Sequence, residues 1–417
     1  MGYTMAEKIL GRASGREGVR AGAYVTARPD YVMSFEAVAG VYLRMSEAGV
    51  DSVWDNERIV IILDHYSPAP SIRAAELQKI ARDFVTRFNI KHYYGEKAGI
   101  CHQVMPELGF VAPGRLIVAT DSHTTTYGAL GCAGTGIGYA EMAYCFLTGE
   151  LWFRIPETIQ LRITGKPGRY VMGKDIILSI AGHLSAEGAQ YRSLEFHGPA
   201  LRDLSLASRM TMSNMAVELG AKFGFFLPDE AVFSFLQDRV RGSYQPIYPD
   251  ADAGYEAVHE FDATLISPQV ALPPNVDDVV PVSEVGDVKI DQAFVGSCTN
   301  GRLEDLRAVA AILSGRKVDR MVRFIVTPAS YEIYKEAIRE GILETIIDAG
   351  GCITHPGCGA CFGAHMGVLA PGEVCVSSSN RNFVGRMGSP EARIYLANPY
   401  VVAASAVAGR IVHPDEL

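Results

Sequence analysis

The chain alternates between short apolar runs and longer segments in which apolar residues recur every three or four positions. Short runs rich in β-branched residues are typical of buried parallel strands. The segment 72–88 has the three-and-four spacing of a helix that buries one face. The clearest apolar runs lie within residues 58–63, 115–119, 291–295, 322–326 and 373–377.

This alternation predicts an α/β fold, in which helices cover both faces of a parallel sheet. Two seams divide the chain, one near residue 150 and one at 266–285, which is rich in Pro and Val and reads as an extended surface linker. They predict three α/β/α domains, at residues 1–150, 151–275 and 276–417.

Each apolar run ends abruptly in polar, reactive side chains. In parallel sheets, ligands bind beyond the carboxyl ends of the strands. We therefore expect one crevice to collect these side chains. The run ends carry Asp64-His65, Asp121-Ser122-His123, Ser297-Cys298-Thr299-Asn300, Thr327-Pro328 and Ser379-Asn380-Arg381.

The amino-acid composition narrows the range of protein classes to which this chain could belong. The 417 residues are 48% hydrophobic and 20% charged, with a net charge of −9. An acidic protein is a poor partner for nucleic acid or an anionic membrane. No stretch approaches the ~18 uninterrupted apolar residues of a membrane helix, and the N-terminus lacks the apolar run of a signal peptide. We expect a reducing cytoplasm, where eight cysteines indicate metal binding or catalysis more readily than disulfides.

Three cysteines stand out by their setting. Cys358 and Cys361 form a C-x-x-C among glycines, and Cys298 follows another predicted strand. Three thiolates could hold an iron–sulfur cluster with one open iron, and the glycines would leave room for so bulky a group. The alternatives are zinc with His355 or Cys352 as fourth ligand, a redox pair, and unliganded thiols. Four other cysteines have apolar neighbours and read as core residues: Cys101, Cys132, Cys145 and Cys375.

Histidines beside acids suggest proton transfer. An Asp next to a His can orient the ring or raise its pKa, which suits acid–base catalysis at His65 and His123. A single such pair would read as a helix cap after a strand. His102 and Glu195 add to the set, and the arginines Arg381 and Arg386 could hold carboxylates by paired hydrogen bonds.

A glycine-rich segment at 128–141 invites a dinucleotide-binding interpretation. After Gly134 and Gly136, however, the third glycine of that motif would fall at 139, which is Tyr139. We interpret the segment as a tight strand-to-helix connection.

Taken together, the motifs resemble those of the aconitase superfamily. "GSCTNG" at 296–301 and "GCGACFG" at 357–363 are similar to the family's cluster-ligand signature. "DSHT", "HQ", "EFHGP" and "NRNFVGR" occur in the family's order, and the resemblance spans nearly the whole chain. It implies three aconitase-type domains around a central cluster crevice. The swivelling fourth domain of a full aconitase is missing, so the chain resembles the large subunit of a split enzyme.

The resemblance also implies roles for the residues. Cys298, Cys358 and Cys361 would ligate one 4Fe-4S cluster, leaving one iron open for a hydroxy di- or tricarboxylic acid that is dehydrated and rehydrated. His65, oriented by Asp64, would protonate the leaving oxygen. The residues expected to hydrogen-bond the departing water are His102, Asp121, His123 and Glu195. Those expected to bind substrate are Asn380, Arg381, Arg386, Phe35 and Glu36.

One position departs from the family. A polar residue usually precedes the acid that aligns with Glu36, and this chain has Phe35 there; Val38 replaces a usual Thr. Loss of a polar partner changes substrate discrimination. The resemblance favours a substrate of the 3-isopropylmalate type, and this departure leaves homocitrate, 2,3-dimethylmalate, citramalate and malate as alternatives.

The resemblance implies a partner as well. The base that removes the carbon-bound proton is a serine of the swivelling domain, so a small subunit should complete the enzyme as a heterodimer or heterotetramer. Two rival functions are a cluster-sensing RNA-binding regulator, which the acidic charge disfavours, and a zinc-stabilised binding protein.

Overall fold

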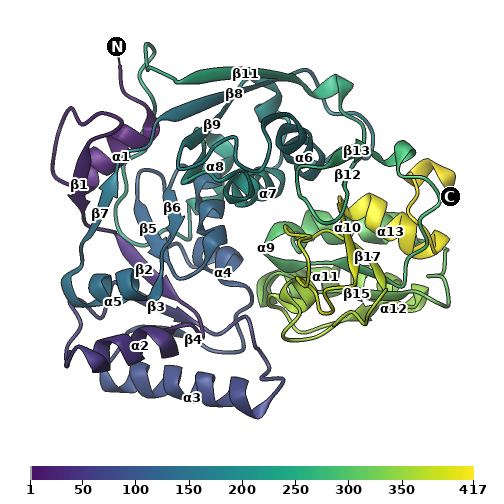
Figure 1. Ribbon diagram of the computed structural model, residues 1–417, viewed down its shortest axis with the longest axis horizontal. Coiled ribbons are helices and arrows are strands. Elements are labelled where there is room, and N and C mark those ends of the chain that lie inside the picture. The colour runs from purple at the N-terminus through teal and green to yellow at the C-terminus, as the bar shows by residue number, and fades with distance from the viewer. Residues whose placement is uncertain (1) are drawn as a thin grey trace.

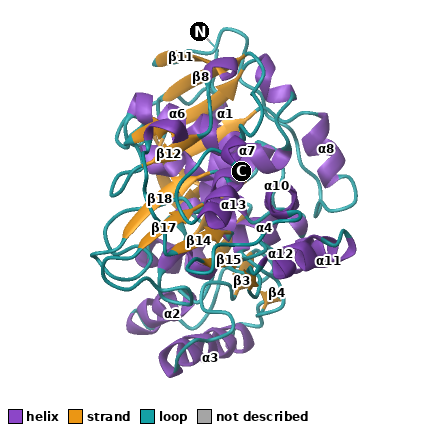
Figure 2. Cartoon of the chain, turned by 90° about the vertical axis from the view of Figure 1, so that its right-hand side faces the viewer, coloured by secondary structure: helices purple, strands orange, loops and turns teal. Residues whose placement is uncertain are grey.

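The computed structural model describes residues 2–417, whose strands form three mainly parallel sheets and one antiparallel ribbon (Figure 1). The ribbon pairs β1 (Tyr24–Ala27) with β7 (Leu151–Arg154). Helices surround the strands (Figure 2). The α/β class predicted from the apolar runs is confirmed.

The first sheet is parallel throughout and has the order β4-β3-β2-β5-β6. Every residue of β3 and β5 is buried, as the two wholly apolar runs predict. Its strands are β2 (Tyr31–Ser34), β3 (Ile59–Ile62), β4 (His92–Tyr94), β5 (Leu116–Ala119) and β6 (Ala133–Gly136). The helices between and after them are α2 (Val38–Glu47), α3 (Ile72–Arg87), α4 (Cys101–Glu107) and α5 (Tyr139–Thr148).

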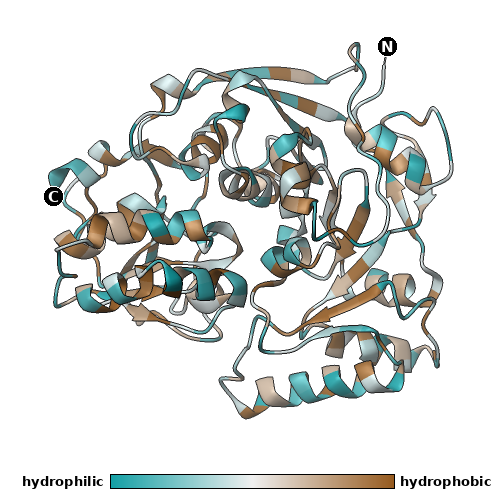
Figure 3. Cartoon of the chain, turned by 180° about the vertical axis from the view of Figure 1, so that it is seen from behind, coloured by the Kyte–Doolittle hydropathy of each residue, from teal (hydrophilic) through white to brown (hydrophobic). Residues whose placement is uncertain are grey.

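Helix α3 forms where the spacing predicts it. Its buried residues recur at intervals of four, three and three positions, which places them on one face: Ala74, Gln78, Ala81 and Phe84. Ser71 caps its start by accepting a hydrogen bond from the Ala74 amide at 3.2 Å. The outer face is largely hydrophilic (Figure 3).

The second sheet is also parallel, with the order β10-β9-β8-β11. Its strands are β8 (Thr158–Thr164), β9 (Ser193–His197), β10 (Phe223–Phe226) and β11 (Ala257–Asp262). The third sheet has the order β13-β12-β18-β17-β14-β15-β16. Its parallel strands are β14 (Gln292–Val295), β15 (Arg323–Val326), β16 (Cys352–Ile353), β17 (Val374–Ser377) and β18 (Arg393–Ala397).

The segment 266–285 is not a surface linker, and that prediction is wrong. It contains β12 (Gln269–Ala271) and β13 (Val279–Pro281), which extend the third sheet in antiparallel fashion. Val270 and Ala271 are fully buried. The proline residues that suggested a linker are compatible with an edge, where a missing N–H leaves no ladder bond unmade.

The remaining helices cover the second and third sheets. In the part of the chain that the structure describes, no helix is long and apolar enough to span a membrane. These helices, with α1 near the N-terminus, are α1 (Met5–Ala13), α6 (Gly173–Leu184), α7 (Leu206–Met215), α8 (Glu230–Leu236), α9 (Ser297–Asn300), α10 (Leu303–Leu313), α11 (Tyr331–Arg339), α12 (Ile342–Ala349) and α13 (Pro399–Ala408).

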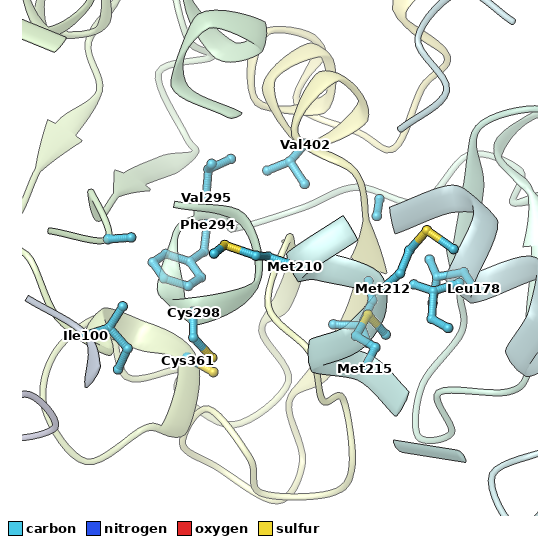
Figure 4. Close-up of a cluster of buried hydrophobic side chains, with 14 of the residues drawn as sticks. Ile100, Leu178, Met210, Met212, Met215, Phe294, Val295, Cys298, Cys361 and Val402 are labelled. Atoms are coloured by element: carbon cyan, nitrogen blue, oxygen red, sulfur yellow. The ribbon is translucent and has the colours of Figure 1, made fainter. Parts of the chain in front are cut away.

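One hydrophobic cluster connects all three sheets. It runs from Met33 in β2 through the methionines of α7 to Phe294 in β14. Figure 4 shows Met210 near Phe294 and Met212 near Leu178, and it shows Cys298 and Cys361 beside each other. Because the packing is continuous, it fixes the positions of the strand ends of the three sheets relative to one another.

Gly128 packs closely against a strand of the second sheet. It lies in the 3₁₀ helix η1 (Ser122–Leu130), and an added Cβ would stand 1.8 Å from the carbonyl oxygen of Gly224 in β10. We expect Gly128→Ala to lower the thermal midpoint, because overpacking typically costs about 1–3 kcal/mol. Gly168→Ala is the control, since its Cβ would meet only a Val171 methyl group at 4.0 Å. Equal midpoints for the two variants in a circular-dichroism melt would contradict this.

Candidate functional site

The carboxyl ends of strands from two sheets meet around one cavity of about 250 Å³. From the first sheet come His65 after β3, His102 in α4, and Asp121 and His123 after β5. From the third come α9, which follows β14, and the loop between β16 and β17. The predicted site residues that line the cavity are Phe35, His65, His102, Asp121, His123, Cys298, Cys358, Cys361, Asn380, Arg381 and Arg386.

The Asp121 carboxylate binds three imidazole rings. Its Oδ1 lies 2.7 Å from His102 Nε2 and 3.5 Å from His123 Nδ1, and its Oδ2 lies 3.4 Å from His65 Nε2. Burial alone would raise the pKa of Asp121, but the charge of His102 and the hydrogen bonds of His102, His123 and His65 hold it well below its usual range. The group is therefore an ionised acceptor that orients all three rings.

His65 lies between two carboxylates. Its Nδ1 is 2.7 Å from Asp64 Oδ1, and Asp64 Oδ2 accepts the Cys101 amide at 2.7 Å. Burial lowers the pKa of His65, but the charges of Asp64 and Asp121 outweigh it and raise the pKa well above 6.5. A ring that stays protonated near neutral pH can act as a general acid.

Glu36 does not face the cavity. Its Oε2 accepts the backbone amides of Asp64 and His65, each at 3.3 Å, and its Oε1 accepts that of Tyr66 at 3.1 Å. Burial, followed by repulsion from Asp64, raises its pKa. The prediction that Glu36 binds substrate is therefore not met; it shapes the turn that carries His65.

Glu195 does not join the site either. Its Oε1 accepts the backbone amide of Met5 at 2.7 Å, and its Oε2 accepts the Tyr255 hydroxyl at 2.9 Å. The carboxylate is fully buried in β9, where it ties down the N-terminal segment. The prediction rested on the "EFHGP" motif of the resemblance, but the partners of the Glu195 carboxylate lie outside the cavity.

The acid that does join the site is Glu218, which the sequence analysis missed. Its Oε1 lies 2.7 Å from His123 Nε2 and 2.8 Å from Arg381 Nε. Burial would raise its pKa, but His123 and Arg381 lower it. Arg381 also donates to Ser122 Oγ at 3.0 Å. The only signal was a lone acid within an otherwise small and apolar stretch, 214–221.

The three predicted ligand cysteines are buried and converge on the same cavity. Amide groups point at their sulfur atoms: Asn214 Nδ2 lies 3.2 Å and Asn380 Nδ2 3.5 Å from Cys298 Sγ. Arg386 donates to Cys361 Sγ at 3.5 Å. All eight cysteines are free thiols. Amide and guanidinium donors aimed at sulfur favour thiolates.

The pKa values of the buried thiols bear on whether these cysteines can bind a metal. A hydrogen bond from Cys358 and the cation of Arg386 lower the pKa of Cys361 well below its usual range. Burial raises the pKa of Cys298 to about 12. A buried thiol of this kind becomes a thiolate when a metal takes the place of its proton. The sulfur donors, their hydrogen-bond partners and the adjacent cavity therefore fit an iron–sulfur cluster.

The glycines of this loop have a purpose beyond the predicted one. An added Cβ at Gly357 would lie 2.8 Å from the Asp64 carbonyl oxygen, and one at Gly359 2.5 Å from Thr327 Oγ1. Gly359 and Gly363 also have left-handed φ angles of 64° and 66°. The glycines let the loop turn tightly against the protein, a role that the sequence analysis did not foresee.

Comparison with known proteins agrees with this geometry. The profile described as "Aconitase family (aconitate hydratase)" matches residues 19–287 and 283–409. The chain belongs to the aconitase family. The 3-isopropylmalate dehydratase large subunit 1 of Methanopyrus kandleri is 49% identical over 415 residues, which are 99% of each chain. The probable methanogen homoaconitase large subunit of Methanothermobacter thermautotrophicus is 47% identical over 99% of this chain and 97% of its own.

A solved structure shares the fold. The aconitase X of Thermococcus kodakaraensis in its holo-form superposes with a TM-score of 0.50 and 12% identity, over 91% of this chain and 93% of the other. Because the chain belongs to the aconitase family and its relatives include dehydratases, it is part of a hydro-lyase.

Asp64→Asn should lower the pKa of His65. The substitution keeps the shape of the side chain but removes the negative charge that most strongly favours the protonated ring. We expect the ring to lose its proton at a pH lower by about one unit or more, which corresponds to ~1.4 kcal/mol per unit. An NMR titration of isotope-labelled histidines measures the shift, with Asp83→Asn on the exposed face of α3 as control. A midpoint that stays in place or rises would contradict the assignment.

Proposed function

We propose that this chain is the large, cluster-binding subunit of a two-part hydro-lyase that dehydrates and rehydrates a hydroxy di- or tricarboxylic acid of the 3-isopropylmalate type. The observation that carries the proposal is the shared cavity, in which three buried thiols face three imidazoles bound to one carboxylate. The names of relatives 46–49% identical support the substrate class.

A bound 4Fe-4S cluster, held by Cys298, Cys358 and Cys361 with one iron free of protein ligands, would supply a Lewis acid at the cavity. Asn214 and Asn380 hold the Cys298 sulfur through their amide groups. Three cysteine ligands would leave one of the four irons without a protein ligand, and that iron could supply Lewis-acid chemistry toward the substrate.

His65 would act as the general acid. Its ring carries a proton at neutral pH because Asp64 and Asp121 both face it, and the protonated ring opens onto the cavity. Donating that proton to a departing hydroxyl group makes it leave as water, which is the difficult part of dehydration. His102 and His123, oriented by Asp121, would hydrogen-bond the same water.

The arginines would bind the carboxylates of the substrate. Arg381 and Arg386 both line the cavity. Arg386 Nε is buried and has no hydrogen-bond partner among residues 2–417. A buried guanidinium donor without a partner costs free energy, and a carboxylate would satisfy it with good geometry.

We further propose a separate small subunit, assembled as a heterodimer or heterotetramer, that contributes the base. The "large subunit" names of the relatives support a partner. The resemblance to the aconitase family implies that the base is a serine of the swivelling domain, which the small subunit would supply. Eight free thiols support a reducing cytoplasm as the location.

Cys358→Ser should abolish the cluster, because serine replaces one of three thiolate ligands. Anaerobically purified parent protein should be brown, with iron and sulfide in near-equal amounts, and active once mixed with its small subunit. Cys375→Ser is the matched control, since Cys375 is buried in β17 and outside the cavity. Colourless, zinc-containing parent protein, or brisk turnover by this chain alone, would overturn the proposal.

Phe35→His should change the ranking of substrates. Phe35 forms an apolar wall of the cavity and stacks on His65 with ring centroids 4.0 Å apart. A new hydrogen bond to a charged group is worth roughly 1.5–3 kcal/mol, or about one to two decades in rate constant. We expect kcat/KM to shift toward isopropylmalate or homocitrate relative to small methylated malates. Phe35→Leu, which keeps the wall apolar, should preserve the ranking of substrates. If the parent and both variants rank the substrates identically, Phe35 only packs against its neighbours and does not select the substrate.

A further inference from the structure

Lys174 is a fully buried lysine close to the cluster site but outside the cavity. It lies in the first turn of α6, and its ammonium donates to the carbonyl oxygens of Ser378, at 3.1 Å, and Ser379. Within the described chain, no carboxylate comes within ion-pair distance of this ammonium. A buried charge without an ion-pair partner is rare, because desolvation disfavours it.

The neighbouring acid does not neutralise Lys174. Asp175 is also fully buried, but its carboxylate accepts the backbone amides of Met172 and Gln269 and the side-chain amide of Asn398. Successive residues of a helix point in directions about 100° apart. The Asp175 carboxylate is thus committed to β12 and the start of α13, while the Lys174 ammonium points toward the end of β17.

The segment that Lys174 holds leads directly to the cluster cysteines. The residue after Ser379 is Asn380, whose Oδ1 lies 3.5 Å from Cys361 Sγ and whose Nδ2 lies 3.5 Å from Cys298 Sγ. Burial lowers the pKa of Lys174 to about 7, and the largest opposing effect is the charge of Cys361. Lys174 thus holds the backbone next to a residue that contacts two cluster cysteines, and the nearby negative charges that favour its protonated form begin with Cys361, followed by Asp175.

We propose that Lys174 is a second cation, beside Arg386, that balances the negative charge of the bound cluster and raises its reduction potential while holding the backbone that orients Asn380. A 4Fe-4S core with three thiolates carries net negative charge, which a buried site must balance. This inference rests on the proposed function. Lys174 is a positioning residue, since it touches neither the substrate cavity nor a cluster sulfur directly.

Two effects of Lys174 can be separated by three substitutions. Lys174→Gln removes the charge but keeps a hydrogen-bond donor for the Ser378 and Ser379 carbonyl groups. Lys174→Met removes both the charge and the donor, and Lys174→Arg keeps both. Lys222→Met is the matched control: Lys222 is also largely buried, but it lies over the rings of Phe153 and Tyr191, and its charged neighbour is Glu141.

The experiment measures the reduction potential of the reconstituted cluster by an EPR-monitored titration, and the rate of iron release to a chelator, in the full chain. Removing a nearby positive charge disfavours electron uptake. We expect both Lys174→Gln and Lys174→Met to lower the reduction equilibrium constant by about ten-fold and to release iron faster. Lys174→Arg and Lys222→Met should match the parent.

Several results would overturn the inference. One is a parent-like reduction potential in both neutral variants. Another is a parent-like potential in Lys174→Gln together with a lowered potential in Lys174→Met, because the hydrogen bond to the backbone would then explain the whole effect. Should neither neutral variant fold, Lys174→Arg decides, because a lowered potential despite the retained charge is incompatible with charge balance. A parent chain that binds no iron–sulfur cluster would instead overturn the proposed function.

Discussion

One buried carboxylate organises the catalytic half of this protein. Asp121 contacts the imidazole rings of His65, His102 and His123, all of which line the cavity. The arrangement is stable because an ionised carboxylate has acceptor capacity for several donors, and because the histidines offset its desolvation. His65 keeps its proton as a consequence, so acid–base chemistry and side-chain orientation have a common origin.

The cysteine side of the site depends on the strand ends of the third sheet. Residues next to the second sheet connect the cysteine side to the histidine side. Glu218 and Asn214 belong to the segment that leads into β10. Glu218 connects His123 of the first sheet to Arg381 of the third, and Asn214 reaches the Cys298 sulfur. Rigid packing of α7 between the sheets maintains these contacts (Figure 4). Close-packed interiors transmit small displacements, so the geometry at sulfur depends on residues far from it in sequence.

The polar and apolar walls of the cavity differ in kind. The arginines and histidines suit carboxylates and water, whereas Phe35 and Phe362 pack against His65 with centroid distances of 4.0 and 5.4 Å. Phe35 stacks on the imidazole and Phe362 packs edge-on to it, and these contacts restrict the orientation of the ring. The same rings leave an apolar surface for the part of the substrate that carries no charge.

The sequence by itself determined the class of fold, the strands and the identity of most site residues. Apolar runs must be buried, and parallel strands place their polar ends at one edge, so Asp64, Asp121 and Cys298 could be assigned from position along the chain. Glu195 and Glu218 are both acids in apolar surroundings, and local pattern does not distinguish them. Only the tertiary structure decided between them, because the direction of a side chain depends on which elements pack against its strand or turn. The glycines at 357–363 and the buried Lys174 also could not be interpreted from the sequence alone. The residues that each of them contacts in the folded protein are distant in sequence, so neighbouring positions do not indicate those contacts.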